Sequence, residues 1–536
     1  MASAPDRAVE TGRTAYENPR RVQWDPSQER VNVIESVLVA NRGEIAVRII
    51  RACRELGIRS VAVYSEADRL SPHVLLADEA YLLGPAPSAE SYLRVDRILE
   101  VAGRAGVVGI HPGYGFLAER ASFAQAVEDA GFTFIGPTAA TIAAMGDKTE
   151  ARQRMAAAGV PIVPGNTEGL ADAAQARKLA REMGFPVLLK ASAGGGGKGM
   201  RVVESEDEVE RALEAARREA AGAFGDDAVY LEKYLEKPRH IEIQLLGDLH
   251  GNIIHLGERE CSIQRRHQKL VEESPSPVVS PELRAAMGAA AVRAAEAVAY
   301  RSAGTVEFLY EDGEFYFLEM NTRIQVEHPV TELVTGIDLV QWQLRIASGE
   351  PIPFRQEEIE PRGHAIECRI TSELPEEGFL PSTGRIRYLE VPTGPGVRWD
   401  GGIAQGFEVG LHYDPLLAKL IVHAPSRTEA IRRMARALEE LTVEGVDTCR
   451  SFHRRVMDEA DYQAGNVTIR YLEEHPEMLS AGDPAHGDPE DLRVAAALAG
   501  LLEAERRRSI RPPRIGAEDR SLSGWQGARG AWRAGQ

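Results

Sequence analysis

The residues best suited to chemistry are five polar side chains at alternate positions: Glu319, Asn321, Arg323, Gln325 and Glu327. Side chains two positions apart in an extended chain point to the same side, so one face would carry carboxylates, amides and a guanidinium. Carboxylate and amide oxygens suit a hard cation, Mg2+ or Mn2+, bridged to phosphate. A solvent-facing edge strand could show the same alternation, but the residues in between are mostly apolar.

A hairpin would bring one more carboxylate, that of Glu307, to this face. β-rich segments lie on either side of the turn sequence Asp312-Gly313, which predicts two antiparallel strands. A two-residue turn would pair Glu307 with Leu318, whereas a three-residue loop centred on Gly313 would set Glu307 opposite Glu319. Two carboxylates that close repel each other unless a cation or a proton lies between them.

The composition predicts a cytoplasmic protein of several domains. The chain has 536 residues, 43% of them hydrophobic, which is enough for two to four domains with real cores. A formal charge of -18 argues against non-specific binding of nucleic acid or of anionic membranes. The four cysteines are widely spaced and form no zinc motif or disulfide scaffold, and no apolar run is long enough to span a membrane.

The first ordered segment has the pattern of a parallel α/β sheet. Residues 37–40 form an apolar strand, an amphipathic helix follows, and residues 60–64 form the next strand. Residues 107–110 and 132–135 are expected as later strands of the same sheet. No GxGxxG fingerprint follows the first strand, which argues against a nicotinamide or flavin cofactor.

A glycine-rich segment, AGGGGKG at 193–199, lies between two expected strands. A P-loop would need Lys followed by Ser or Thr and then a helix, but here Lys198 precedes Gly199. Strand, glycine loop and strand instead predict a flexible hairpin lid whose backbone N–H groups can close over phosphate oxygens. Lys148 and Lys190 would each be solvated if taken singly. Together with the lid and the carboxylates they predict a triphosphate clamp.

Taken together, these segments resemble the biotin carboxylase component of biotin-dependent carboxylases, an ATP-grasp enzyme. The resemblance runs from about residue 34 to residue 472, and seven motifs carry it in order. Carbamoyl-phosphate synthetases share the grasp, but two of the strings look like the biotin branch, HPGYGFL and EMNTRIQVEH. The motifs are ANRGEIA (40–46), HPGYGFL (111–117), MGDK (145–148), the glycine-rich segment, QRRHQK (264–269), EMNTRIQVEH (319–328) and GHAIECR (363–369).

The resemblance implies a fold of mixed α/β and α+β character. It would contain an N-terminal parallel-sheet domain, an ATP-grasp domain with a mobile glycine-rich lid, and a C-terminal biotin carboxylase domain. The expected divisions are a polar arm at 1–33, the N-terminal domain at 34–146, the lid domain at 147–235, the ATP-grasp core with the C-terminal domain at 236–478, and a tail at 479–536.

The resemblance also implies where ATP and its metal ions bind. Glu307 and Glu319 would hold Mg2+ (or Mn2+) that bridges the ATP phosphates, with Asn321 on a second ion. The other residues expected around the nucleotide are Lys148, Lys190, Gly195, Gly196, Gly197, Lys198, Gly199 and Met200 at the phosphates, Glu232, Lys233 and Leu235 at the adenine, and His240, Gln264 and His267 at the ribose and purine.

In the family's reaction, bicarbonate attacks the γ-phosphate of ATP to give carboxyphosphate, which releases CO2 and phosphate. Glu327 would deprotonate bicarbonate, because a weakly acidic, poor nucleophile needs a positioned base. The phosphate can take the N1' proton of biotin, and Arg369 would stabilise the resulting enolate. The residues that would hold bicarbonate are Lys269, Arg323, Gln325 and Val326.

The partners are expected on other chains. No Met is followed by Lys, so the usual Met-Lys-Met biotin attachment sequence is absent, and nothing resembles a carboxyltransferase. We therefore expect a homodimeric subunit that serves an acyl-CoA carboxylase, with biotin on a separate carrier protein and with a separate carboxyltransferase subunit. The tail holds an expected helix from Asp488 and two tryptophans, Trp525 and Trp532. It would dock one of these partners, or it is an idle appendage.

Two other functions are open at this point. One is an ATP-grasp ligase that uses bicarbonate without biotin. The other is an inactive nucleotide-binding assembly subunit. Intact acidic and basic site residues argue against an inactive subunit, because a dead relative usually loses at least one of them.

Overall fold

The computed structural model describes residues 34–166, 169–191, 200–224, 227–266, 268–480, 497–502 and 505. The chain divides into a large unit that ends at Leu479 and a C-terminal segment, Ser480–Gln536. Residues 497–502 of that segment are helical, within the stretch where a helix was expected. Asp488, Trp525, Trp532 and the arm at 1–33 lie outside the described residues.

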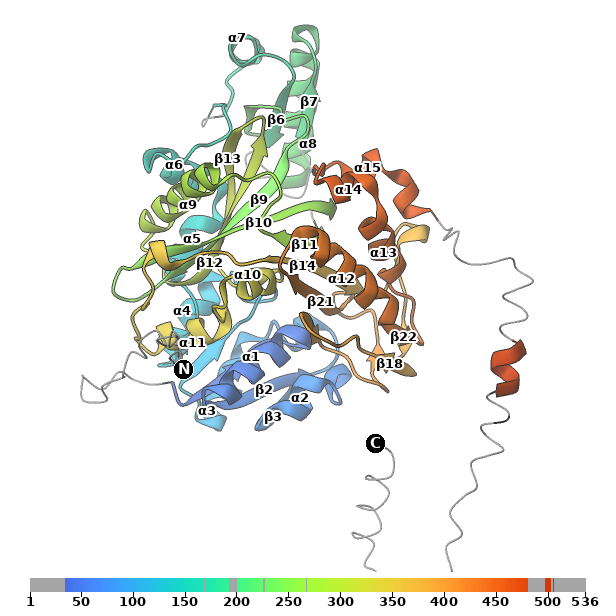
Figure 1. The fold of residues 1–536 in the computed structure, drawn as a ribbon. Coiled ribbons are helices and arrows are strands. Elements are labelled where there is room, and N and C mark those ends of the chain that lie inside the picture. The colour runs from blue at the N-terminus through green and yellow to red at the C-terminus, as the bar shows by residue number, and fades with distance from the viewer. Residues whose placement is uncertain are drawn as a thin grey trace, which may run out of the picture. The chain divides into compact units, whose positions relative to one another are not determined.

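The large unit begins with the expected parallel sheet (Figure 1). Its elements are β1 (Ser36–Val39), α1 (Gly43–Glu55), β2 (Arg59–Ser65), α2 (Pro72–Leu76), β3 (Glu79–Gly84), α3 (Val95–Ala105), β4 (Gly109–His111), α4 (Ala121–Asp129), β5 (Thr133–Phe134) and α5 (Ala139–Gly146). The strands are ordered β3-β2-β1-β4-β5, and every pair is parallel. β1 is buried throughout, as strands covered on both faces are.

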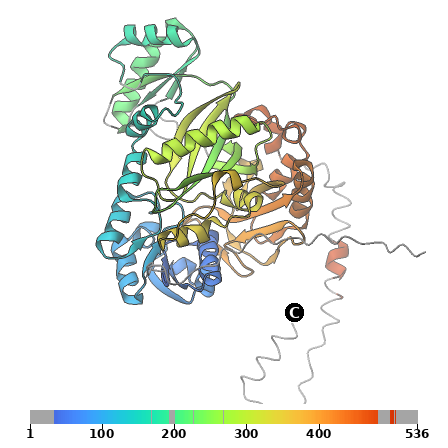
Figure 2. The same ribbon diagram turned by 60° about the vertical axis from the view of Figure 1, so that its left-hand side comes forward.

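A small antiparallel sheet follows, and it forms the lid unit (Figures 1 and 2). Its elements are α6 (Lys148–Ala157), α7 (Ala173–Met183), β6 (Val187–Ala191), β7 (Met200–Val203), α8 (Val209–Phe224) and β8 (Val229–Lys233). β6 lies between β7 and β8, and Lys190 pairs with Met200. This pairing confirms the expected hairpin. The glycine-rich residues between its strands, with Gly195, Gly196, Gly197, Lys198 and Gly199, lie outside the described residues.

One eight-stranded antiparallel sheet forms the centre of the remaining chain, in the order β13-β12-β9-β10-β11-β14-β21-β19. Its strands are β9 (Arg239–Gly247), β10 (Ile253–Arg265), β11 (Gln268–Ser274), β12 (Ser302–Glu311), β13 (Glu314–Asn321), β14 (His364–Thr371), β19 (Val397–Gly401) and β21 (Leu416–Ala424). The sheet therefore joins strands before residue 321 to strands after residue 364 without a break.

Helices and short strands surround this sheet (Figure 2). α9 packs on β9 and β10 through small and apolar side chains, and α12 packs on β14 and β21. The helices are α9 (Pro281–Glu296), α10 (His328–Thr335), α11 (Leu339–Ala347), α12 (Arg427–Glu440), α13 (Arg450–Asp458), α14 (Ala460–Ala464) and α15 (Tyr471–Glu474). The short strands are β15 (Glu373–Leu374), β16 (Leu380–Pro381), β17 (Gly384–Arg385), β18 (Tyr388–Glu390), β20 (Glu408–Val409) and β22 (Thr442–Glu444).

The hairpin of β12 and β13 corrects the register that its turn alone predicts. The turn is the two-residue type, with positive φ at Asp312 (51°) and Gly313 (89°). Such a turn should pair Glu307 with Leu318, but the ladder shifts by one residue at Leu318 and sets Glu307 opposite Glu319. A β-bulge of this kind adds one residue to one strand and re-aims the side chains beyond it.

The extended segment expected to carry all five alternating polar residues ends early, so that expectation was wrong. β13 stops at Asn321, residues 322–326 form a loop, and Glu327 is the N-cap residue of α10. Pro329 lies in the first turn of α10, where its fixed φ favours a helix start. The polar residues therefore reach one site by way of a strand, a loop and a helix start.

Within the described parts of the chain, no helix is long and apolar enough to cross a membrane. The four cysteines are all buried and form no disulfide. Burial raises the pKa of the Cys53 thiol to about 12, so that this thiol stays protonated.

Candidate functional site

A cavity of about 610 Å3 lies between the lid unit and the eight-stranded sheet. Residues that were predicted from separate motifs line it together. They are Lys148, Lys190, Met200, Glu232, Lys233, Leu235, His240, Gln264, Lys269, Glu307, Glu319, Asn321, Arg323, Gln325, Val326, Glu327 and Arg369. His267, which was expected beside them, lies outside the described residues.

The centre of the site is the buried ammonium group of Lys269 on β11. Its Nζ donates to Glu242 at 2.5 Å, to Glu307 at 2.9 Å and to Glu327 at 2.6 Å. Burial alone would lower the pKa of Lys269, but the three carboxylates raise it well above its usual range. Lys269 is therefore a permanent cation in a setting where an anion would interact strongly with it.

A second buried cation, Arg259, holds the strands around this centre and was not among the predicted site residues. Its guanidinium is fully buried and uses all of its nitrogens. The donor-rich run from 259 to 269 was a signal, but it gave no reason to prefer Arg259 over its neighbours. The groups that accept from Arg259 are Glu242 (2.5 Å), Gln244 (2.6 Å), Gln325 (2.6 Å), Thr331 (3.0 Å) and Thr305 (3.1 Å).

Glu327 lies between two cations. One of its oxygens accepts from Lys269, and the other accepts from Nη2 of Arg369 at 2.9 Å. Burial would raise the pKa of Glu327, but Lys269 and Arg369 together lower it well below its usual range. The Nε of Arg369 is held in turn by Glu272 at 2.6 Å. Glu327 is thus an ionised, oriented proton acceptor.

The Glu307 and Glu319 pair has the properties of a cation site. Burial opposes the charge of Glu307, but Lys269 and His240 lower its pKa far below the usual range. Burial and the charge of Glu307 raise the pKa of Glu319. A divalent cation between the two would relieve this repulsion, and Asn321 offers an amide oxygen nearby, so the donor set fits Mg2+ or Mn2+.

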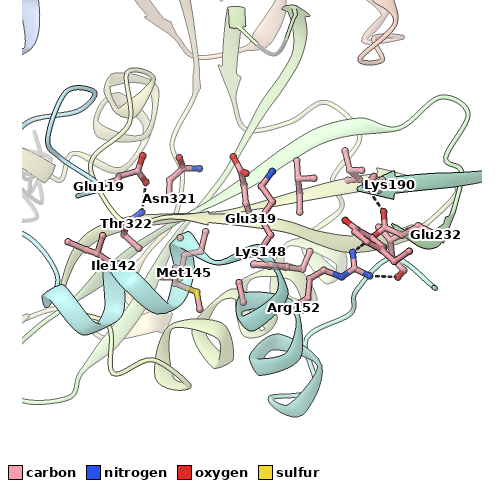
Figure 3. A pocket seen from close by; sticks show the side chains of 18 of the residues that line it. Glu119, Ile142, Met145, Lys148, Arg152, Lys190, Glu232, Glu319, Asn321 and Thr322 are labelled. Atoms are coloured by element: carbon pink, nitrogen blue, oxygen red, sulfur yellow. Dashed lines mark hydrogen bonds and ion pairs between the residues drawn. The ribbon is translucent and has the colours of Figure 1, made fainter. Parts of the chain in front are cut away.

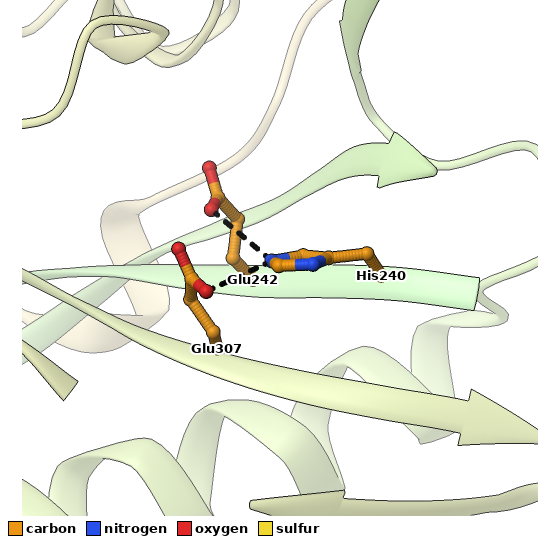
Figure 4. A group of neighbouring side chains, drawn as sticks. All are labelled: His240, Glu242 and Glu307. Carbon is orange, nitrogen blue, oxygen red and sulfur yellow. Dashed lines mark ion pairs between the residues drawn. The ribbon is translucent and has the colours of Figure 1, made fainter. Parts of the chain in front are cut away.

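The ring of His240 lies against Glu307 (Figure 4). Its Nε2 is 3.1 Å from a Glu307 oxygen and 3.9 Å from a Glu242 oxygen. Burial would lower the pKa of His240, but the adjacent Glu307 carboxylate raises it. In this arrangement the imidazole is a partner of the carboxylates.

On the phosphate side of the cavity, Glu232 forms ion pairs with two cations (Figure 3). Lys190 lies 2.5 Å from one oxygen, and Arg152 of α6 donates to the other. The guanidinium of Arg152 also lies 5.6 Å from the centre of the Tyr230 ring. No sequence signal marks Arg152, because it is one of several arginines on an ordinary helix. Lys148 projects into the same space from the start of α6.

The N-terminal domain contributes to the site through Glu119. The Nε of Arg323 donates to Glu119 at 2.9 Å, and Nη2 of Arg323 donates to Asn321 at 2.8 Å. Glu119 also accepts from the backbone N–H of Thr322 at 3.2 Å. These bonds fix the loop that follows β13.

A second cavity, of about 340 Å3, shares Lys269, Arg323 and Arg369 with the first one. Its other walls come mainly from the N-terminal domain and from the loop that holds Tyr413. Arg42 lies in this wall, 2.7 Å from Asp68 and 4.1 Å from the centre of the Tyr413 ring. The site thus opens into two connected spaces, one beside the lid and one beside the first domain.

Comparisons with known proteins follow the same division of the chain. Residues 33–142 match the family model "Biotin carboxylase, N-terminal domain", and residues 367–474 match "Biotin carboxylase C-terminal domain". Residues 147–355 match "Carbamoyl-phosphate synthase L chain, ATP binding domain". The chain is 54% identical to biotin carboxylase from Haemophilus influenzae, over 82% of this chain and 98% of that protein. It is 55% identical to a pyruvate carboxylase subunit from Methanothermobacter thermautotrophicus, over 84% and 91%.

Solved structures give the same result. The biotin carboxylase domain dimer of Hydrogenobacter thermophilus 2-oxoglutarate carboxylase, solved with MgADP, ADP and bicarbonate, is 51% identical with a TM-score of 0.77. The match covers 84% of this chain and 100% of that one. The Campylobacter jejuni biotin carboxylase complex with a β-γ-ATP ligand is 46% identical with a TM-score of 0.78, over 83% and 100%. These matches confirm the expected three-domain fold.

Proposed function

Because this chain belongs to the biotin carboxylase family, we propose that it carboxylates biotin at the expense of ATP, with bicarbonate as the carbon source and Mg2+ as the metal. The observation that carries this proposal is the array of Lys269, Glu327 and Arg369 beside the Glu307 and Glu319 pair. The two biotin carboxylase models that match either side of the ATP-binding segment favour this activity over a biotin-independent ligase.

The proposed chemistry begins with bicarbonate at Lys269, Arg323, Gln325 and the backbone of Val326. Glu327 takes the bicarbonate proton, and the freed oxygen attacks the γ-phosphate of ATP, so that ADP leaves and carboxyphosphate forms. Carboxyphosphate divides into CO2 and phosphate inside the closed site. The phosphate takes the N1' proton of biotin, and N1' then attacks CO2. Arg369 stabilises the negative charge that develops on the ureido oxygen.

The metal and the nucleotide are assigned to the lid side of the cavity. Glu307 and Glu319 would hold Mg2+, with Asn321 beside them, and the ion would supply charge neutralisation at the ATP phosphates. ATP phosphates would draw Lys190 away from Glu232 and would also contact Lys148. The remaining assignments are Gly195, Gly196, Gly197, Lys198, Gly199 and Met200 at the phosphates, Glu232, Lys233 and Leu235 at the adenine, and His240, Gln264 and His267 at the ribose and purine.

The partners are part of the proposal. A dimer is supported by the dimeric relative from H. thermophilus. Biotin would be carried by a separate protein, and a separate carboxyltransferase subunit would choose the acceptor, for which we propose an acyl-CoA. Relatives named for pyruvate and 2-oxoglutarate carboxylation make 2-oxo acids the alternative acceptors. We place the protein in the cytoplasm, and we propose the domain limits 34–146, 147–235 and 236–478.

The test is fixation of labelled bicarbonate onto free biotin with Mg-ATP, repeated with a biotinylated carrier domain. We expect label in an acid-labile carboxybiotin that depends on both biotin and ATP. Hydrolysis of ATP without labelled carboxybiotin, on free biotin and on the carrier domain alike, would contradict the proposal and favour a ligase that uses bicarbonate without biotin.

A further inference from the structure

Two buried glutamates lie side by side on strands β11 and β14, next to Arg369. Glu272 and Glu367 are direct partners in the antiparallel ladder, so their side chains share one face of the sheet with β-carbons about 5 Å apart. Both side chains are fully buried. Arg369 follows Glu367 by two positions on β14 and therefore projects from the same face.

The hydrogen bonds of these two carboxyl groups are incomplete. One oxygen of Glu272 accepts from the Nε of Arg369 at 2.6 Å. Its other oxygen, and both oxygens of Glu367, have no hydrogen-bond partner among the described residues. A buried carboxylate that is ionised and unpartnered is strongly unfavourable, so at least one of the two groups must be neutral or must find a donor.

The cations near Glu367 are already engaged. Lys419 donates to the backbone oxygen of Val326 at 2.7 Å and lies 3.2 Å from Glu44. The Tyr114 hydroxyl donates to Glu44 as well. Carboxyl groups therefore outnumber cations here, which calls for a proton. The carboxyl groups of this layer are Glu44, Glu272, Glu327 and Glu367, and its cations are Arg369 and Lys419.

We propose that Glu367 carries a proton and donates it in a hydrogen bond to the free oxygen of Glu272, so that the pair holds one negative charge. This single bond satisfies an oxygen on each residue. The hydrogen bond from Arg369 favours the anion on Glu272 and thereby assigns the proton to Glu367. Burial raises the pKa of both groups, and repulsion by Glu272 adds to the rise at Glu367.

Glu367 is then a positioning residue for biotin carboxylation, a role that rests on the proposed function of Arg369. The singly charged pair holds Nε of Arg369 while its Nη2 faces Glu327. Loss of the shared proton would put two charges on one side of the guanidinium and draw it away from the biotin oxygen. Carboxylation should therefore fall at alkaline pH, although Lys269, whose pKa is raised, stays protonated there.

Two variants of Glu367 separate the shared proton from simple packing. Glu367→Gln keeps a neutral donor to Glu272, so it should lose the alkaline fall in kcat/KM for biotin that the wild type shows. Glu367→Met keeps the volume but donates nothing, so Arg369 should be misplaced and kcat/KM for biotin should fall about 100-fold. Hydrolysis of ATP that depends on bicarbonate, measured without biotin, should fall much less.

Two further measurements do not depend on activity. The infrared spectrum should contain a band of a buried neutral carboxylic acid that disappears in Glu367→Gln. In thermal unfolding, the folded pKa of the pair lies above the unfolded value of about 4.5, so folding takes up a proton. The wild type should therefore lose stability relative to Glu367→Gln as pH rises from about 4.5 towards the pKa of the pair.

Glu260→Gln is the matched control, because Glu260 is another buried glutamate of the same sheet whose pKa is raised, to about 7, by burial. That variant should keep the alkaline fall of the wild type. If Glu367→Gln keeps the same pH profile and the same infrared band as the wild type, the shared proton is refuted. If the wild type carboxylates no biotin at all, the proposed function fails, and the infrared band and the unfolding difference still decide between one proton and none.

Discussion

Replacing Glu327 by Gln tests the base directly. Glutamine keeps the shape of the side chain but cannot take up a proton at neutral pH. The Glu327 carboxylate accepts from Lys269 at 2.6 Å and from Arg369 at 2.9 Å. In the variant, Lys269 keeps two other carboxylates and Arg369 keeps Glu272, so neither cation is left without an anion. The fold should therefore survive, and the change should appear in the rate.

A general base contributes about 10²- to 10⁴-fold to a rate, which corresponds to about 3–5 kcal/mol of activation free energy. We expect kcat for carboxylation in Glu327→Gln to fall by that factor. The KM for bicarbonate should stay level or decrease, because removal of one carboxylate leaves Lys269 and Arg369 with a larger net positive charge towards an anion. A split between kcat and KM is thus the signature of the base.

The assay is labelled bicarbonate fixation at several bicarbonate concentrations, with thermal unfolding as a check on the fold. Glu242→Gln is the matched control, since Glu242 contacts the same ammonium at 2.5 Å but does not contact Arg369. It should cost more stability and less rate. Equal losses of kcat in the two variants, or a raised KM with an unchanged kcat in Glu327→Gln, would refute the assignment of Glu327 as the base.

Three further changes have distinct outcomes. Arg259→Met removes the buried partner of Glu242, so we expect denaturant unfolding to show a loss of about 3–5 kcal/mol, and a loss below about 1 kcal/mol would contradict the network. Glu319→Gln should raise the Mg2+ concentration for half-maximal rate at least about tenfold, because it leaves Glu307 as the remaining carboxylate of the pair; an unchanged Mg2+ titration would exclude Glu319 as a ligand. His73 is fully buried, and burial lowers its pKa to about 4. The unfolded state therefore binds more protons between about pH 6.5 and pH 4, and stability falls by about 3 kcal/mol as pH falls through that window; His73→Gln should flatten the curve of unfolding free energy against pH, and a curve of unchanged slope would show that His73 is not responsible.

The parts of the fold that could be predicted from the sequence are those fixed by local patterns. The apolar strand at 37–40 and its amphipathic helix predicted the parallel sheet, because both periodicities are read within one segment. The hairpin around the glycine-rich segment followed in the same way from two short β-rich runs. Motif spacing brought most of the cavity residues together before any contact between them was known.

The parts that could not be predicted depend on contacts between distant segments. The bulge at Leu318 reverses the pairing that the Asp312-Gly313 turn favours, and nothing in the hairpin sequence indicates it. Glu242 and Arg259 are fully buried charges, but in sequence each looks like a polar residue on the outer face of a strand. Only the assembled sheet shows that each is the other's partner.

The continuous eight-stranded sheet has a consequence for how this protein can be divided. The family models place a boundary between residues 355 and 367, yet β11 and β14 pair directly across it through Val271–Ser274 and Ala365–Cys368. A chain cut there would expose two long unpaired strand edges, which favour aggregation over independent folding. The segments that evolution exchanges as modules are here one cooperative folding unit. We therefore expect the pieces to be recovered in soluble form only when they are expressed together.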